Sequence, residues 1–336
     1  MKRAEPLSLV MHESPEETSL DFHPKTFTEY LGQKELKDKL SLYTRAARER
    51  KEPLDHVLLF GPPGLGKTTL AQIMAHEMNA GIKICSGPML ERTGDMVALL
   101  SSLEPRDIFF IDEIHRMPTS VEEVLYSAME HFRVDVIIGQ GAGAQSINLQ
   151  LNPFTLIGAT TKAGLISGPL RSRFGIVERL HFYCDEDLQS IVLQNGRYLG
   201  LSLTDSAALL IAKASRGTPR VAKKIIRRIR DFAQVHREAA SDELVKEALA
   251  FLSIDEEGLT PVDHLFLQTL IERFEGGPAG IETLASIIGE DADTLEDVYE
   301  PYLLRKGYIE KTARGRQVPT KKVLSLKRKY LGQQHV

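Results

Sequence analysis

The segment Gly61–Thr68 has the composition and spacing of a loop that binds a nucleoside triphosphate. Its glycines let backbone N–H groups turn toward phosphate oxygens, and a following helix would add the positive end of its dipole. Lys67 would neutralise the β- and γ-phosphates, and the Thr68 hydroxyl would ligate Mg²⁺. An apolar run precedes the loop and a helical pattern follows it, which is the context that this motif requires. The loop therefore predicts triphosphate binding together with Mg²⁺.

Two adjacent acids, Asp112 and Glu113, follow the apolar run at residues 108–111. A buried strand there would deliver both carboxylates to the carboxyl edge of a parallel sheet, where ligands bind. Asp112 would then hold Mg²⁺ through water, and Glu113 would orient or deprotonate the attacking water. An exposed turn is the alternative for such a pair, but the apolar strand argues against it. The two acids predict hydrolysis of the triphosphate.

Three further sites could act on the γ-phosphate, and two of them have a plainer alternative. Thr161 follows a third apolar run, either as a sensor of the phosphate or as a strand cap. Arg171 and Arg173 stand in a loop, either as a surface pair or with one of them reaching a neighbour's phosphate. Such an arginine finger is worth roughly 10³–10⁵ in rate. Arg220 lies at the start of a predicted helix, from which it could contact the nucleotide.

Apolar runs alternate with helical patterns between about residues 35 and 190, which predicts a doubly wound α/β domain with a parallel sheet. The expected strands are 57–60, 108–111 and 154–157, and the expected helices include 68–79 and 120–131. Residues 133–138 and 146–151 alternate around the glycine-rich segment 139–143, which predicts a β-hairpin.

The pattern is helical after Tyr183, which predicts a small helical domain. Its expected helices are 185–199, 204–215, 219–237 and 241–252. Further helices at 262–274, 281–288 and 294–306, the last kinked at Pro301, precede a basic hairpin at 308–318. Three helices followed by such a hairpin predict a winged helix. We therefore expect a disordered tail at 1–20 and domains at 21–184, 185–255 and 256–336.

The charge distribution suggests DNA as a partner. Residues 301–336 carry ten basic residues and one acid, although the whole chain has a net charge of −4. A basic end on an acidic body fits a protein with one DNA-facing end, and a solubilising tail is the alternative. Cys85 and Cys184 lack metal-ligand spacing, and no stretch is long and apolar enough to span a membrane. These features predict a cytoplasmic protein with reduced cysteines.

Taken in order, these motifs resemble those of the AAA+ ATPases and, within them, the RuvB family of branch-migration motors. The resemblance covers about residues 20–325 and includes the segments 31–33, 112–116, 158–161, 170–175 and 312–316. It implies an ATP-driven hexameric ring on duplex DNA at Holliday junctions, acting in recombination and repair with RuvA and, at resolution, RuvC. It also implies three domains: a large AAA+ ATPase domain, a helical lid and a winged-helix head.

The resemblance also implies roles for individual residues. Thr161 would be the first sensor, Arg173 the arginine finger that acts on a neighbour, and Arg220 the second sensor. The hairpin at 133–151 would dock RuvA, and Lys311 and Arg316 would touch DNA. The positions that would contact ATP are Phe22, His23, Gly64, Gly66, Lys67, Thr68, Thr69, Glu130, His131, Phe132, Arg173, Tyr183 and Arg220.

Two positions depart from the family pattern. His23 stands where an arginine usually approaches the adenine; it can stack but lacks a permanent charge. Lys311 replaces a common arginine, a change that a phosphate contact tolerates better than a bidentate contact does.

Two other functions are compatible with parts of the sequence. A clamp loader or initiator would share the nucleotide motifs, but a clamp loader usually has a Ser-Arg-Cys finger and often a zinc ribbon, where this chain has Ser172-Arg173-Phe174 and no zinc spacing. A nucleotide-switched DNA regulator would need residues that read bases, whereas the basic residues here are of the phosphate-contacting type.

Overall fold

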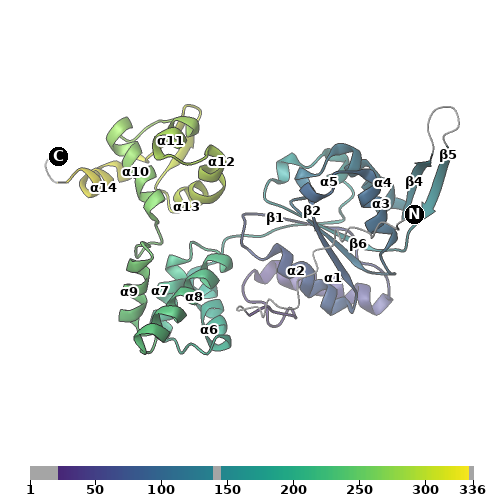
Figure 1. The fold of residues 1–336 in the computed structure, drawn as a ribbon, viewed down its shortest axis with the longest axis horizontal. Helices are drawn as coiled ribbons and strands as arrows, with labels where there is room; N and C mark the ends of the chain where they lie inside the picture. The colour runs from purple at the N-terminus through teal and green to yellow at the C-terminus, as the bar shows by residue number, and fades with distance from the viewer. Residues whose placement is uncertain (1–21, 139–144, 333–336) are drawn as a thin grey trace, which may run out of the picture. The chain divides into compact units, whose positions relative to one another are not determined.

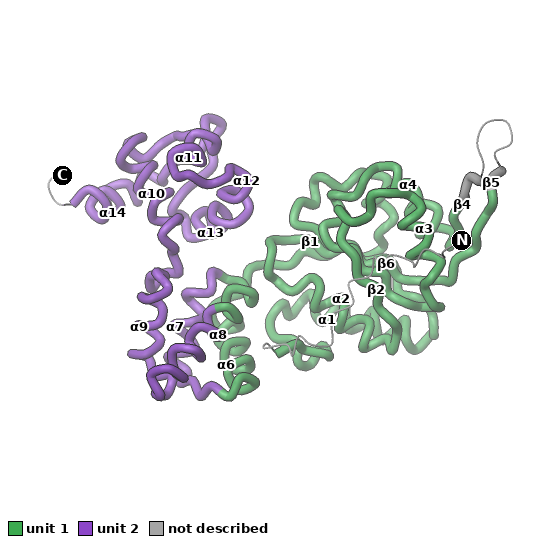
Figure 2. The backbone as a smooth tube through the Cα atoms, viewed as in Figure 1, with its two compact units in different colours: residues 1–200, 217–224 green, residues 201–216, 225–336 purple. Residues whose placement is uncertain are grey.

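The computed structural model describes residues 22–138 and 145–332, so the predicted tail and the predicted turn at 139–143 lie outside the described residues. The chain forms two compact units (Figure 2). The first contains residues 1–200 and 217–224, and the second contains residues 201–216 and 225–336. Among the described helices, none is long and apolar enough to cross a membrane.

A five-stranded parallel sheet in the order β2-β3-β6-β1-β7 is the centre of the first unit (Figure 1). Its strands are β1 (Val57–Phe60), β2 (Ile82–Ser86), β3 (Ile108–Asp112), β6 (Thr155–Thr160) and β7 (Ile176–Arg179). The three apolar runs became the three central strands, which are buried almost throughout. The predicted parallel sheet is confirmed. The edge strands β2 and β7 were not predicted, because each keeps polar residues on a half-exposed face.

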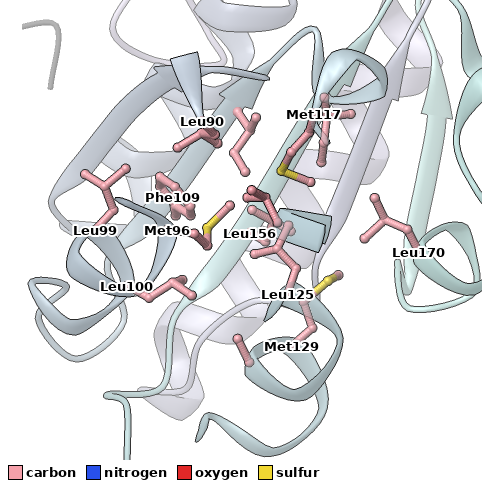
Figure 3. Packing of buried hydrophobic residues seen from close by; sticks show 14 of the residues in the cluster. Leu90, Met96, Leu99, Leu100, Phe109, Met117, Leu125, Met129, Leu156 and Leu170 are labelled. Carbon is pink, nitrogen blue, oxygen red and sulfur yellow. The ribbon is translucent and has the colours of Figure 1, made fainter. Parts of the chain in front are cut away.

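Helices of this unit pack on both faces of the sheet. They are α1 (Lys34–Arg50), α2 (Lys67–Met78), α3 (Thr93–Ser101), α4 (Thr119–His131) and the short α5 (Gly168–Arg171). Helix α6 (Asp185–Tyr198) follows the last strand of the sheet and begins the helical part of the chain. Phe109 and Leu156 meet Met96 of α3 and Leu125 of α4 in one apolar core (Figure 3). Helix α2 lies against β3 and β6 and packs on α1. Burial on both faces explains why the central strands are continuously apolar.

A separate antiparallel hairpin pairs β4 (Arg133–Ile138) with β5 (Gln145–Gln150), as the alternating pattern predicts. Its register pairs Arg133 with Gln150.

The second unit joins helices of the predicted helical domain to the winged helix. Its first part holds α7 (Asp205–Ala214) and α9 (Asp242–Phe251), whose first turns are capped by the Thr204 and Ser241 side chains. Helix α8 (Pro219–His236) begins in the first unit and continues into the second. The winged helix consists of α10 (Pro261–Phe274), α11 (Ile281–Ile288), α12 (Ala292–Thr294), α13 (Glu300–Arg305), β8 (Glu310–Thr312), β9 (Gly315–Gln317) and α14 (Thr320–Leu331).

The third helix of the winged helix differs from the expected single kinked helix. A π-helical turn over Leu295–Tyr299 separates α12 from α13, and Pro301 occupies the first turn of α13. A proline lacks the N–H that continues an α-helix, so the hydrogen-bond pattern changes just before it. The terminal helix α14 was not predicted.

Candidate active site

The phosphate loop follows β1 and has the backbone that the glycine spacing implies. Gly61, Gly64 and Gly66 have φ values of 146°, 78° and 99°. A Cβ on Gly61 would lie 2.5 Å from the Leu180 carbonyl oxygen, and one on Gly64 would lie 2.9 Å from Cβ of Arg220. Only glycine fits these two positions, so the loop keeps its backbone open to a ligand. Gly66 directly precedes α2, so the first N–H groups of this helix would point toward an anion held by the loop.

Lys67 is buried in this loop. Its Nζ donates to the carbonyl oxygens of Gly61, at 2.8 Å, and Pro62, at 3.0 Å. Burial lowers the pKa of Lys67, the Asp112 and Glu113 carboxylates oppose that shift, and the Arg220 guanidinium adds to it. The structure therefore brings together the predicted lysine, both acids and the predicted second sensor.

The carboxyl edge of the sheet carries the predicted acids. Asp112 ends β3, and its Oδ1 accepts from the Glu113 N–H at 2.9 Å. Glu113 has a left-handed φ of 48°, so the chain turns sharply there. Thr161 Oγ1 donates to Glu113 Oε2 at 3.3 Å, which joins the predicted sensor to the predicted base.

His115 belongs to this site and was quoted in the sequence without a role. Its Nδ1 lies 3.3 Å from Glu113 Oε2 and 2.8 Å from Thr160 Oγ1. The imidazole and the Thr161 hydroxyl together hold the Glu113 carboxylate in one place. A histidine two residues after an acid is a weak signal, because the sequence does not show that the two side chains lie close together.

The donor set of this edge fits Mg²⁺. The Thr68 hydroxyl stands in the first turn of α2, and the Asp112 carboxylate stands at the end of β3. Both supply oxygen, the ligand that this hard cation prefers, and phosphate oxygens and waters usually complete its shell.

Beside the loop lies a pocket with an empty volume of about 390 Å³, part of it open to solvent. Its walls include four of the predicted contacts, Phe22, Gly66, Thr69 and Tyr183. His23 is exposed and is not among the lining residues. The sequence missed Tyr30, Asn195 and Lys223, which also line the pocket.

Two tyrosines support the phosphate loop from this pocket. The hydroxyls of Tyr30 and Tyr183 lie 2.8 Å apart, so one donates to the other, and both oxygens lie within reach of the Leu65 carbonyl oxygen, at 3.4 and 3.3 Å. Burial raises the pKa of Tyr183 to about 12 and that of Tyr30 well above its ordinary value, so both stay protonated. Phe22 is fixed beside them, since its N–H donates to Asn195 Oδ1 at 3.2 Å. Lys223 Nζ donates to the Phe22 carbonyl oxygen at 2.6 Å.

Arg173 lies at the opposite edge of the sheet. It lies three residues before β7, whose Ile176 pairs with Val57 at the start of β1, whereas the phosphate loop follows the end of β1. The guanidinium donates to the Pro169 carbonyl oxygen at 2.7 Å, lies 3.1 Å from Glu130 Oε1 and covers the Tyr126 ring at 4.5 Å. Arg173 therefore does not face the phosphate loop of its own chain.

The segment 130–132 lies on the side of Arg173. Glu130 pairs with Arg173, and the Phe132 ring packs edge-on against Phe154 with centroids 5.8 Å apart. None of Glu130, His131 and Phe132 lines the described pocket, so their role in binding ATP stays a prediction.

The wing residues Lys311 and Arg316 face each other across the β8–β9 hairpin. Both bind Glu300: Lys311 Nζ lies 2.8 Å from Oε2, and Arg316 Nε lies 2.7 Å from Oε1. Glu296 pairs with both cations as well. The side chain of Glu300 is 1% exposed and that of Arg316 13%, but that of Lys311 is 51% exposed. Arg316 thus neutralises a buried acid, and Lys311 is the more exposed of the two predicted DNA contacts.

Comparison with known proteins gives the same family over all three regions. Family models match in order: the Holliday junction DNA helicase RuvB P-loop domain over residues 22–180, the RuvB AAA lid domain over 183–255 and the RuvB C-terminal winged helix domain over 256–327. The Holliday junction branch migration complex subunit RuvB of Staphylococcus haemolyticus is 52% identical over 305 residues, covering 90% of this chain and 92% of the relative. The corresponding subunit of Oenococcus oeni is 54% identical over 302 residues, covering 90% and 89%.

Solved structures of similar sequence have the same fold. The Thermotoga maritima RuvB Holliday junction branch migration motor is 47% identical, with a TM-score of 0.82 over 91% of this chain and 98% of that chain.

Proposed function

This chain belongs to the RuvB family of Holliday-junction branch-migration motors, and from that premise we propose how its own residues turn ATP hydrolysis into movement of DNA. It is an ATP-dependent, helicase-type enzyme with a P-loop domain, a lid and a winged helix. Its activity is branch migration in recombination and repair.

The carboxyl edge of the sheet is the proposed site of hydrolysis. Gly64, Gly66 and Lys67 hold the phosphates, and the buried ammonium of Lys67 gains charge compensation from the phosphate oxygens beside it. Thr68 and Asp112 would hold Mg²⁺, which neutralises phosphate charge when bound.

Glu113 orients the attacking water and accepts its proton. Thr161 and His115 fix the Glu113 carboxylate, so the base does not need to be ordered at the moment of reaction. Phe22, Thr69, Tyr183 and Arg220 would contact the rest of the ATP from the pocket and from α8, and His23 would lie at its rim.

The proposed assembly is a hexameric ring. Arg173 lies at the sheet edge opposite the phosphate loop, so it can reach a γ-phosphate only in a neighbouring chain. Head-to-tail contacts of this kind form a ring when the rotation from one subunit to the next closes. Glu130, His131 and Phe132 would enter the shared site beside this arginine.

The proposed partners are duplex DNA at a Holliday junction, RuvA and RuvC. The β4–β5 hairpin would dock RuvA, because it stands apart from the sheet as a two-stranded element and exposes the apolar side chain of Ile147. Lys311 would contact the phosphate backbone, with Arg316 beneath it. A cytoplasmic location is part of this proposal.

The observation that carries the proposal is the convergence of Lys67, Glu113 and Thr161 at one sheet edge with Arg173 at the other. The test is migration of a synthetic four-way junction by purified protein with ATP, with and without RuvA. We expect migration that RuvA strongly increases and that Lys67→Ala abolishes. A wild-type protein that hydrolyses ATP but leaves the junction in place with RuvA present would refute the proposed function.

A further inference from the structure

The segment Arg216–Arg220 carries the chain from one compact unit to the other. Arg216 ends a stretch of the second unit, and Gly217 begins a stretch of the first. On the nucleotide side, the Gly217 carbonyl oxygen accepts from the Tyr183 N–H at 3.0 Å. The Arg220 N–H donates to the Gly64 carbonyl oxygen at 3.3 Å. Four of these five residues therefore belong to the unit that holds the phosphate loop.

Arg216 is attached to the winged helix instead. Its guanidinium makes two parallel hydrogen bonds with Asp263 of α10, from Nη1 to Oδ2 at 2.9 Å and from Nη2 to Oδ1 at 3.1 Å. The side chain of Arg216 is 11% exposed and that of Asp263 is 0% exposed. The guanidinium also lies over the Tyr302 ring, 4.5 Å from its centroid, and Nη2 donates to the Tyr299 carbonyl oxygen at 3.4 Å. This is a planar, bidentate contact that fixes direction as well as distance.

The partner of Arg216 is itself rigidly held. Asp263 closes a capping box at the start of α10, where its Oδ2 accepts from the Thr260 N–H at 2.8 Å and the Thr260 hydroxyl caps the Asp263 N–H. Arg216 has a left-handed φ of 56°, a conformation that a non-glycine residue keeps only when its surroundings impose it. Both ends of the contact are therefore fixed, one by the helix and one by the turn.

We propose that Arg216 is a positioning residue that transmits the nucleotide state of the phosphate loop to the winged helix. The inference rests on the proposed function, because it assumes that ATP hydrolysis drives the DNA-binding domain. A change at the phosphate loop that moves Gly64 also moves the backbone of Arg220, to which it is hydrogen-bonded. The turn is short, so this movement reaches Arg216, and the bidentate contact passes it to α10. The turn at 216–220 is therefore one element that is bonded to the phosphate loop at one end and to α10 at the other. Energetic coupling between two sites requires such a shared element.

A buried ion pair that serves only to stabilise the fold is the competing explanation, and the variants separate the two. Removing one partner would leave a buried charge and could unfold the domain. The main variant is therefore the double substitution Arg216→Met with Asp263→Asn. It removes both charges, keeps an acceptor for the Thr260 N–H and removes the bidentate contact. Arg216→Lys keeps the charge without the two parallel bonds, and Arg228→Ala, which breaks an exposed pair with Asp231, is the matched control.

Four quantities are measured on full-length protein: basal ATPase, ATPase with duplex DNA, junction migration with RuvA, and DNA affinity without nucleotide. For the double variant we expect basal ATPase and DNA affinity within about twofold of wild type. We expect stimulation by DNA to be lost and migration to fall at least tenfold. Arg216→Lys should lie between, and Arg228→Ala should behave as wild type.

Three outcomes would overturn the inference. Wild-type migration by the double variant would show that the contact transmits nothing. A loss of basal ATPase as large as the loss of migration would place Arg216 in the nucleotide site. A loss of DNA affinity measured in the absence of nucleotide would show that Arg216 only stabilises the fold of the winged helix. Failure of the wild-type protein to migrate a junction would refute the proposed function instead, so the two failures are distinguishable.

Discussion

Glu113 is held by two side chains, and this arrangement separates ATP binding from ATP hydrolysis. Thr161 Oγ1 and His115 Nδ1 both lie 3.3 Å from its Oε2, while phosphate binding depends on Lys67 and the loop. We therefore expect Glu113→Gln to bind ATP as wild type does and to hydrolyse it about 10²–10⁴ times more slowly, the usual contribution of a general base. Single-turnover hydrolysis and equilibrium nucleotide binding measure the two effects.

The matched control for this prediction is Glu123→Gln, which makes the same change at an exposed position of α4. It should leave both quantities unchanged. Rapid turnover by Glu113→Gln would remove Glu113 from its role as the base.

The nucleotide residues that the sequence identified are those adjacent to a strong local signal. Lys67, Asp112 and Thr161 each follow or close an apolar run, so their meeting at one sheet edge follows from strand order alone. Tyr30, Asn195 and Lys223 have no such signal, because they come from separate elements that meet only in the folded chain. A sequence without such a signal cannot show which tyrosine or amide lines a pocket.

Among the strands of the sheet, those that are buried on both faces could be predicted from the sequence, and those that are partly exposed could not. The central strands β1, β3 and β6 are apolar throughout, whereas the edge strands β2 and β7 carry Lys83, Glu178 and Arg179. The basic residues of α14 suggested a charged tail, although Val323, Leu326 and Tyr330 recur at helical spacing and pack on the core of the winged helix. The wing was found as a hairpin, but its salt bridges depend on Glu296 and Glu300, which come from the preceding helical segment.

The two cations of the β8–β9 hairpin should therefore behave differently. Lys311→Ala removes a half-exposed cation and should weaken binding to all DNA sequences, reducing the salt slope by about 1, with little change in stability. Arg316→Ala leaves the buried Glu300 without its main partner and should lower the free energy of unfolding by about 3–5 kcal/mol.

Salt titrations of DNA binding and chemical denaturation measure these two effects on the same preparations. Lys327→Ala, a change at a half-buried lysine of α14, is the control for the loss of one positive charge. Equal effects of Lys311→Ala and Arg316→Ala on the salt slope, without a loss of stability for either, would contradict this division of roles.

Lys67 and Arg173 lie at opposite ends of the strands of the sheet, so the way in which they share one active site can be tested only in an assembly of chains. If each active site takes its phosphate loop from one chain and its arginine from the next, Lys67→Ala and Arg173→Ala damage different halves of the same site. Each variant alone should be inactive, since loss of an arginine finger costs roughly 10³–10⁵ in rate. In a mixed ring, however, an Arg173→Ala chain supplies an intact loop and a Lys67→Ala chain supplies an intact arginine.

A mixture of the two inactive variants should therefore regain part of the wild-type ATPase rate. The recovery should rise with protein concentration as mixed rings form, because the restored sites lie at heterologous contacts between chains. Mixing Lys67→Ala with Glu113→Gln provides the control, since both changes lie in the same half of the site and no combination restores it. No recovery with Arg173→Ala would place the arginine in its own chain's site and contradict the ring, and recovery in the control would show that Lys67 and Glu113 do not share one half of the site.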